Sequence, residues 1–91
     1  MLERARDKDQ EAVTFVLPSD HPAGDTSVVG DFNSWRPGIH RFNLRRDGSR
    51  AVTIDLPLDR QFAFRYLSAD GWWFDEETAD GHDGRNSLLH T

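Results

Sequence analysis

Apolar and polar residues alternate with a period of two along most of the chain. The clearest run is Val52–Leu56, whose first, third and fifth residues are apolar and which Pro57 ends. Similar runs are Val13–Leu17 and Phe62–Tyr66. Alternation of this kind is typical of β-strands with one buried face, whereas an amphipathic helix repeats about every 3.6 residues. No segment shows the helical period, so the pattern predicts an all-β protein.

Turn-forming residues separate these runs at intervals of about 8–12 residues, the spacing expected of an all-β sandwich. Asp47-Gly48 and Asp70-Gly71 are strong signals for tight turns, and Ser19–Asp25 is rich in loop-forming residues. We predict further short strands at Thr26–Val29, Phe42–Leu44, Trp72–Phe74 and Asn86–His90, with a loop over Asp75–Gly84. The expected fold is a sandwich of about seven short antiparallel strands. Its predicted core contains Phe15, Val28, Val52, Ile54, Phe62 and Phe64.

Residues 1–11 differ from the rest, because they are charged and show no periodicity. We expect a charged N-terminal tail there, with a short solvated helix as the alternative. A chain of 91 residues has room for one small domain, which we place at residues 12–91.

Composition excludes several classes of function. The formal net charge of −5 disfavours binding to a phosphate backbone, so no nucleic-acid partner is expected. The absence of cysteine excludes a disulfide framework and a thiolate metal site. No apolar run is long enough to span a membrane, and the N-terminus lacks the apolar segment of a secretory signal. A cytoplasmic domain without a cofactor is the expectation.

The three tryptophans are the most informative residues. Trp35 lies in Gly30–Gly38, a loop-like segment, and either covers the core or faces a ligand. Trp72 and Trp73 are adjacent, so in extended backbone their side chains point to opposite faces. Both faces cannot be the core of a two-layer sandwich, and at least one of these indoles is therefore expected to be exposed.

An exposed indole beside polar side chains suits a sugar. The apolar C–H face of a pyranose packs on the negative face of an aromatic ring, and planar polar groups bind the surrounding hydroxyls. An active site has less support, because sixteen carboxylates in a short chain make close acidic pairs inevitable and a glycosidase needs two carboxyls in a cleft. The histidines show no paired metal spacing, and the acidic run Asp75-Glu76-Glu77 is typical of a solvated loop. We predict no catalytic residue and no metal site.

Three motifs follow one another in an order that resembles a known family: Gly30-Asp31-Phe32-Asn33-Ser34-Trp35, Phe62-Ala63-Phe64-Arg65-Tyr66 and Asp70-Gly71-Trp72-Trp73. Together with the strands around them, from about residue 12 to 91, they resemble the family 48 carbohydrate-binding modules. These early-set, immunoglobulin-like domains occur at the N-termini of isoamylases and glycogen-branching enzymes. The family also includes the glycogen-binding domain of the AMP-activated protein kinase β subunit.

The resemblance implies an immunoglobulin-like sandwich that binds α-1,4-glucan without catalysis. It implies that Trp35 and Trp73 stack on glucose units and that Asn86 bonds sugar hydroxyls. The kinase subunit has a lysine at the position of Ala63 and a leucine near the position of His82. The remaining candidate binding residues are Arg65, on the same face as Ala63, and Asn33, which ranks last because an asparagine there also caps its own loop.

Two alternatives remain open. A protein-interaction module of the same fold would use the exposed indoles to dock a partner, for which a glycogen-metabolising enzyme is the candidate. A glycoside hydrolase would need a cleft with paired carboxylates. A wide apolar patch would favour the first alternative, and accessible rings with polar groups at their rim favour sugar binding.

Overall fold

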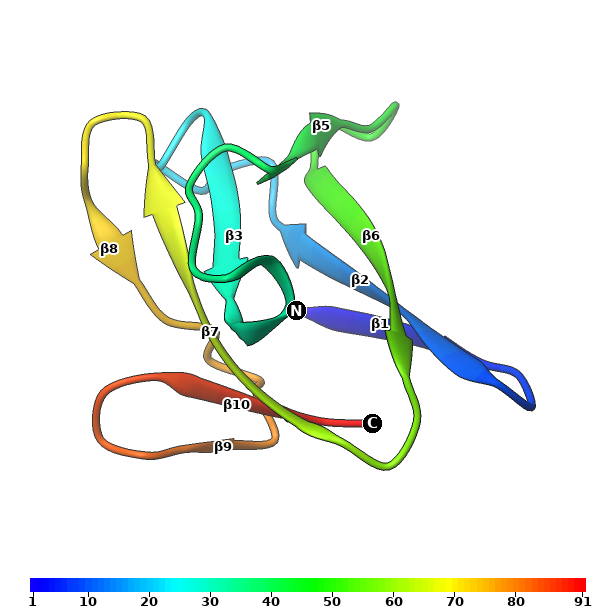
Figure 1. Ribbon diagram of the computed structural model, residues 1–91. Helices are drawn as coiled ribbons and strands as arrows, with labels where there is room; N and C mark the ends of the chain where they lie inside the picture. The colour runs from blue at the N-terminus through cyan, green and yellow to red at the C-terminus, as the bar shows by residue number, and fades with distance from the viewer.

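Two antiparallel β-sheets, packed face to face, make up the computed structural model, which describes residues 1–91 (Figure 1). The all-β, immunoglobulin-like sandwich expected from the sequence is confirmed. Six strands have four residues or more and four have two, and the only helix is the 3₁₀ turn η1. In chain order the elements are β1 Leu2–Arg6, β2 Gln10–Leu17, β3 Thr26–Gly30, η1 Asp31–Asn33, β4 His40–Arg41, β5 Asn43–Leu44, β6 Arg50–Pro57, β7 Gln61–Ser68, β8 Trp73–Phe74, β9 Gly81–His82 and β10 Ser87–His90.

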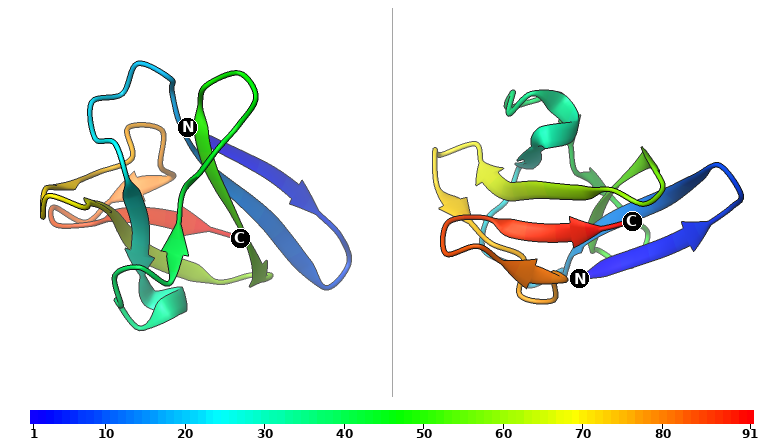
Figure 2. Two further views of the ribbon diagram at one scale, coloured as in Figure 1. Left: turned by 90° about the horizontal axis from the view of Figure 1, so that it is seen from above. Right: turned by 60° about the horizontal axis from the view of Figure 1, so that its bottom comes forward.

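One sheet has the order β1-β2-β6-β5, and the other has the order β4-β3-β7-β10-β9 with β8 also paired to β7. The first sheet lies to the right in Figure 1 and the second to the left. Figure 2 shows the two layers from other directions, with the η1 loop (teal) projecting beyond them. Strand β7 is the only strand bonded to three others, so it organises the second sheet.

The core fills the space between the sheets with alternate residues of the longer strands. Of the predicted core residues, Phe15, Val28, Ile54 and Phe64 are buried, while Val52 and Phe62 are half-buried at its margin. The ring centroids of Phe15 and Phe64 lie 5.2 Å apart at an interplanar angle of 70°. Edge-to-face packing of this kind adds to the stabilisation from burial alone.

The N-terminal segment was expected to be a tail, and this expectation is wrong for residues 2–6. They form β1, which pairs with β2 and sets Leu2 opposite Phe15. Arg4 and Arg6 share the side of Leu2 but are charged and exposed, so the strand lacks the apolar alternation that would have identified it. The guanidinium of Arg4 donates to Oδ1 of Asp80 at 2.8 Å and to the carbonyl of His90 at 3.1 Å. Those bonds join β1 to the opposite sheet.

Two further expectations need correction. The predicted strand Phe42–Leu44 is split, because β4 pairs with β3 and β5 pairs with β6 in the other sheet. Phe42 is buried where the chain crosses between the sheets, and Leu44 is 71% exposed. The predicted loop Asp75–Gly84 contains β9, which pairs with β10. A strand of two residues is too short to produce a readable alternation.

Gly30 is packed tightly against the backbone of β7. A β-carbon at this position would lie 2.5 Å from the carbonyl oxygen of Ala63 and 2.8 Å from Cβ of Phe64. Backbone cannot yield to such a contact as a flexible side chain can, so only glycine fits here. This close approach brings η1, the next element, directly against the edge of β7.

We expect Gly30→Ala to destabilise the fold by about 1–3 kcal/mol, because it overpacks a buried backbone contact. Gly81→Ala is the matched control, since its β-carbon would meet nothing nearer than Cδ1 of Leu88 at 3.8 Å. Its effect is expected to stay within about 0.5 kcal/mol. Urea unfolding followed by circular dichroism measures both, and equal effects would contradict this account of Gly30.

Candidate functional site

The two faces of β7 have different roles. Phe64 and Tyr66 are buried and point into the core, while Ala63, Arg65 and Leu67 alternate with them and point outward. We call this second side the outer face. The outer face is half-buried along its length, so neighbouring loops partly cover it.

Trp73 lies on the outer face because it pairs directly with Leu67. Its side chain is 40% exposed. Trp72 is 48% exposed and lies on the other side of β8, where its ring centroid is 4.9 Å from that of Phe74. His21 stacks on Phe74 from the same side, with centroids 4.9 Å apart. The prediction that the two adjacent indoles point to opposite faces, with at least one exposed, is confirmed.

Arg65 lies over the ring of Trp73. Its Cζ is 5.7 Å from the ring centroid, and its Nε donates to Oδ1 of Asp75 at 3.1 Å. The carboxylate holds the guanidinium in place, and the cation stacks on the indole. Neither Nη atom of Arg65 bonds to the protein, so both remain free to donate to a ligand.

Asn86 precedes β10 and extends toward the same face. The register of β10 with β7 pairs Ser87 with Phe64, and one further step sets Asn86 opposite Arg65. The backbone N–H of Asn86 donates to Oδ1 of Asp83 at 2.6 Å, which fixes the turn. Its side-chain amide makes no hydrogen bond within the protein, so its donor and acceptor are available.

Trp35 reaches this region from the η1 loop. Its Nε1 donates to Oδ1 of Asp31 at 2.9 Å, and Oδ2 of Asp31 accepts the backbone N–H of Ala63 at 2.8 Å. The loop then turns back over the outer face of β3, because the N–H of Gly38 donates to Oγ of Ser27 at 3.2 Å. The half-buried indole of Trp35 is therefore tied, through Asp31, to the edge of β7 that faces β3.

Asn33 does not belong to this surface, which corrects its place among the candidate binding residues. Its Oδ1 accepts the N–H of Gly30 at 3.0 Å, and its Nδ2 donates to the carbonyl of Val28 at 2.9 Å and contacts Nδ1 of His40 at 3.0 Å. The side chain is buried with all its polar atoms bonded. A sugar would have to break these bonds, so Asn33 is a structural residue of the loop.

The two positions that depart from the family pattern differ in placement. Ala63 lies on the outer face beside Arg65, where its small side chain leaves room. His82 pairs with Ser87, which is fully buried on the core side, so the two side chains share that side of the sheet. His82 therefore points away from the outer face, which carries Arg65, Trp73 and Asn86.

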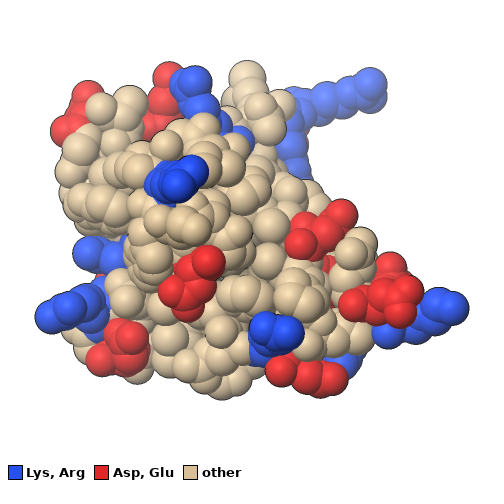
Figure 3. Space-filling view, in the orientation of Figure 1, with Lys and Arg blue, Asp and Glu red and all other residues tan.

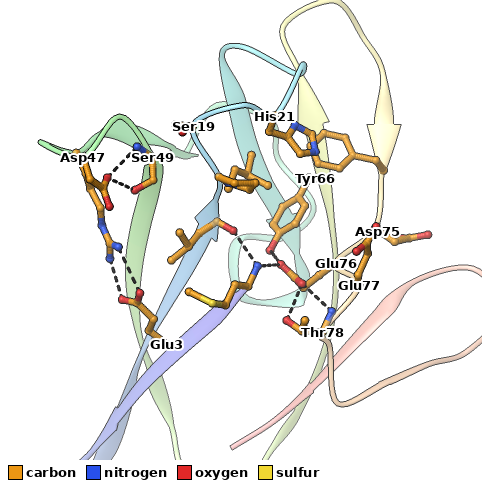
Figure 4. A pocket seen from close by; sticks show the side chains of 16 residues that line it. Glu3, Ser19, His21, Asp47, Ser49, Tyr66, Asp75, Glu76, Glu77 and Thr78 are labelled. Atoms are coloured by element: carbon orange, nitrogen blue, oxygen red, sulfur yellow. Dashed lines mark hydrogen bonds and ion pairs between the residues drawn. The ribbon is translucent and has the colours of Figure 1, made fainter.

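The main hollow of the molecule lies elsewhere. It is a groove of about 630 Å³ at one open side of the sandwich, and its walls come from β1, β2, β7, β8 and the loops near them (Figure 4). None of the four candidate residues Trp35, Arg65, Trp73 and Asn86 lines it. A sugar that stacks on exposed rings needs an open surface rather than this groove, so the two sites are separate.

Glu76 lies at the floor of the groove, and sequence reasoning missed it by assigning the whole acidic run to a solvated loop. It is 3% exposed. Oε1 accepts from the Met1 ammonium at 2.6 Å and from the Tyr66 hydroxyl at 2.9 Å, and Oε2 accepts the N–H and the hydroxyl of Thr78, each at 2.8 Å (Figure 4). No sequence signal distinguishes Glu76 from Glu77, because only the fold supplies these partners.

Hydrogen bonds hold three carboxyls of the groove in the charged form. Burial raises the pKa of the Glu76 carboxyl, but the hydrogen bonds from the Met1 ammonium, Thr78 and Tyr66 outweigh it, and the pKa lies below its ordinary value. The pKa of Glu3 is also lowered, by its hydrogen bonds with Arg45, and that of Asp47 by Ser49. A lowered pKa keeps these three carboxylates charged at neutral pH, where they accept hydrogen bonds from their neighbours.

The charge distribution and the helix content add two findings. Basic and acidic side chains are interspersed on the face shown in Figure 3, with no basic stripe of the kind that follows a phosphate backbone. No three histidine, aspartate or glutamate side chains are grouped so as to hold a metal ion. The only helical segment is three residues long, far short of the roughly 20 that a membrane-spanning helix needs.

No protein-family model matches this chain, and none of the curated proteins matches it either.

We expect Glu76→Gln to lower the free energy of unfolding by about 2–3 kcal/mol at pH 7, because charged hydrogen bonds in a buried site are lost. The folded-state pKa of Glu76 lies below its ordinary 4.5, so its contribution is present above pH 4.5 and disappears as the pH falls through the folded-state value. Urea unfolding between pH 7 and pH 3 should show a smaller acid loss in Glu76→Gln than in the wild type. Exposed Glu77→Gln, the control, should follow the wild type, and a parallel curve for Glu76→Gln would refute the assignment.

Proposed function

We propose that this chain binds α-1,4-glucan without catalysis, by stacking glucose units on Trp35 and Trp73. The observation that carries the proposal is the exposed indole of Trp73 on the outer face of β7, with the guanidinium of Arg65 over its ring. Trp35 is anchored to the backbone of the same strand at Ala63 through Asp31. A linear glucan presents successive apolar ring faces, which suits two aromatic platforms on one side of a sheet.

The polar groups beside the indoles support the same ligand. Both Nη atoms of Arg65 are free to donate to hydroxyls, and the amide of Asn86 can donate and accept. The indole N–H of Trp35 is already bonded to Asp31, so Trp35 acts through its ring face. An open surface leaves the ligand well hydrated, and a dissociation constant in the micromolar to millimolar range, about −8 to −4 kcal/mol, is expected.

The motifs shared with the family 48 carbohydrate-binding modules add to this proposal. Trp35, Trp73 and Asn86 occupy the positions that the resemblance implies for glucan contacts, and the early-set sandwich is the fold that it implies. We accordingly place the protein in the cytoplasm, where it tethers or senses glycogen beside a glycogen-metabolising enzyme.

The second candidate function is docking of a partner protein, and Trp72 favours it. Trp72, Phe74 and His21 form a continuous aromatic cluster on the opposite side of β8 from Trp73. An exposed tryptophan supported by other aromatic rings is typical of an interface hot spot. The same residue is therefore a control for sugar binding and a probe for docking.

We expect isothermal titration with maltoheptaose to show saturable binding that Trp35→Ala and Trp73→Ala each weaken at least about tenfold, because each removes one stacking platform. Trp72→Ala removes an equally large exposed indole from the other side and should leave the affinity within about twofold. Circular dichroism checks that each variant is folded.

If the folded wild-type protein does not bind maltoheptaose at millimolar concentration, the proposal is wrong. Equal losses in Trp72→Ala and Trp73→Ala would also count against it. If the wild type binds no maltoheptaose, docking of a partner protein becomes the proposed function. Cross-linking of the wild type and of Trp72→Ala to partner proteins then tests it.

We expect Asn86→Ala to weaken maltoheptaose binding about fivefold, because it removes a hydrogen-bonding amide worth about 1 kcal/mol. The structure has no internal use for that amide, so thermal stability should not change. Asn43→Ala is the matched control, since Asn43 is exposed on β5 in the other sheet. An unchanged affinity in Asn86→Ala would remove Asn86 from the site.

A further inference from the structure

We infer that Asp31 is a positioning residue for the proposed glucan site: it sets the orientation of the Trp35 indole without touching the sugar itself. The inference rests on the proposed function for its consequence in binding. Its structural part, that the Asp31 carboxylate fixes the indole, stands on the geometry alone.

The Asp31 carboxylate links two donors from different elements. Oδ1 accepts Nε1–H of Trp35 at 2.9 Å, and Oδ2 accepts the backbone N–H of Ala63 at 2.8 Å. Ala63 belongs to β7 just beyond the point where its pairing with β3 ends at Gly30. The Asp31 side chain therefore satisfies the first N–H of β7 beyond its pairing with β3, and through Asp31 the Trp35 indole is attached to β7.

The backbone at Trp35 explains why such an attachment matters. Ser34 and Trp35 both have φ 57°, in the left-handed region that bulky residues seldom adopt. A tight bond from the N–H of Trp35 to the carbonyl of Gly30, at 2.9 Å, holds this turn. The side chain is only half-buried, so packing alone leaves the ring free to change rotamer. The bond to Asp31 removes that freedom.

A fixed ring favours binding because little side-chain entropy is lost when the sugar stacks on it. Each carboxylate oxygen of Asp31 faces a protein N–H, which directs the group toward the protein. Asp31 thus acts through Trp35. At Trp73 the arrangement is similar but indirect: Asp75 accepts a hydrogen bond from Arg65, and Arg65 lies over the ring of Trp73.

The first test is the hydrogen exchange of the Trp35 indole N–H, followed by NMR of ¹⁵N-labelled protein. Asp31→Asn keeps only one acceptor oxygen for two donors and has no charge, so the indole N–H either loses its acceptor or keeps a weaker, neutral hydrogen bond. We expect the Trp35 indole proton to exchange at least about tenfold faster than in the wild type, as expected when a charged hydrogen bond is lost. Asp55→Asn, an identical charge change at an exposed position of β6, should leave the exchange unchanged. Unaltered exchange in folded Asp31→Asn would overturn the inference.

The second test is a double-mutant cycle in maltoheptaose affinity with Trp35→Phe, which keeps an aromatic ring but has no N–H. We expect Asp31→Asn to weaken binding about threefold to tenfold in the wild type and little in the Trp35→Phe background. Equal losses in both backgrounds would show that Asp31 acts through Ala63 alone, and the inference would fall. If Asp31→Asn does not fold, Asp31→Glu, which keeps the charge but moves the carboxylate by one methylene, takes its place in the same cycle, with the same outcomes.

The two proposals fail separately. A wild-type protein that binds no maltoheptaose refutes the glucan function, while the exchange measurement still decides whether Asp31 fixes the indole.

Discussion

The rest of the structure depends on strand β7 and on one geometric rule: successive side chains of an extended strand point to opposite sides. Phe64 and Tyr66 on one side supply the centre of the core, and Ala63 and Arg65 on the other side form the middle of the candidate site. Every element that contributes to that site is bonded to β7. The candidate site and the core are therefore built on the same backbone.

The acidic side chains of this protein act mainly as internal acceptors. Asp31 bonds the indole of Trp35, Asp75 holds Arg65, Asp83 closes the turn before β10, and Glu76 collects four donors beneath the groove. A small sandwich has many loop N–H groups that no strand can satisfy, and carboxylates satisfy them at low cost near the surface. Several of the sixteen acidic residues thus have a structural use as acceptors within the fold.

The strands that could be predicted from the sequence are the long ones. The strands β2, β6 and β7 have eight residues each, enough for alternation to show, and they were predicted close to their observed positions. Strand β1 could not be predicted from periodicity because its pairing with β2 relies on backbone bonds along a charged edge. The opposite directions of Trp72 and Trp73 followed from adjacency alone. The structural use of Asn33 was within reach of the sequence, because its partners lie three to seven residues away and a loop cap was considered for it. By contrast, the burial of Glu76 depends on a partner 75 positions away in the chain, which no local pattern reveals.

The Trp72-Trp73 pair on β8 has a consequence for evolutionary change. Strand β8 pairs with β7 over only two residues, so the gain or loss of one residue in the preceding Asp70-Gly71 turn would shift its register by one. Such a slip reverses the side to which each residue points. Because both neighbours are tryptophan, an indole would still face outward and another would still lie on the opposite side. Two adjacent tryptophans therefore keep an indole on the outer face after a change of one residue in the length of the Asp70-Gly71 turn. With a single tryptophan, the same change would turn the only indole to the other side.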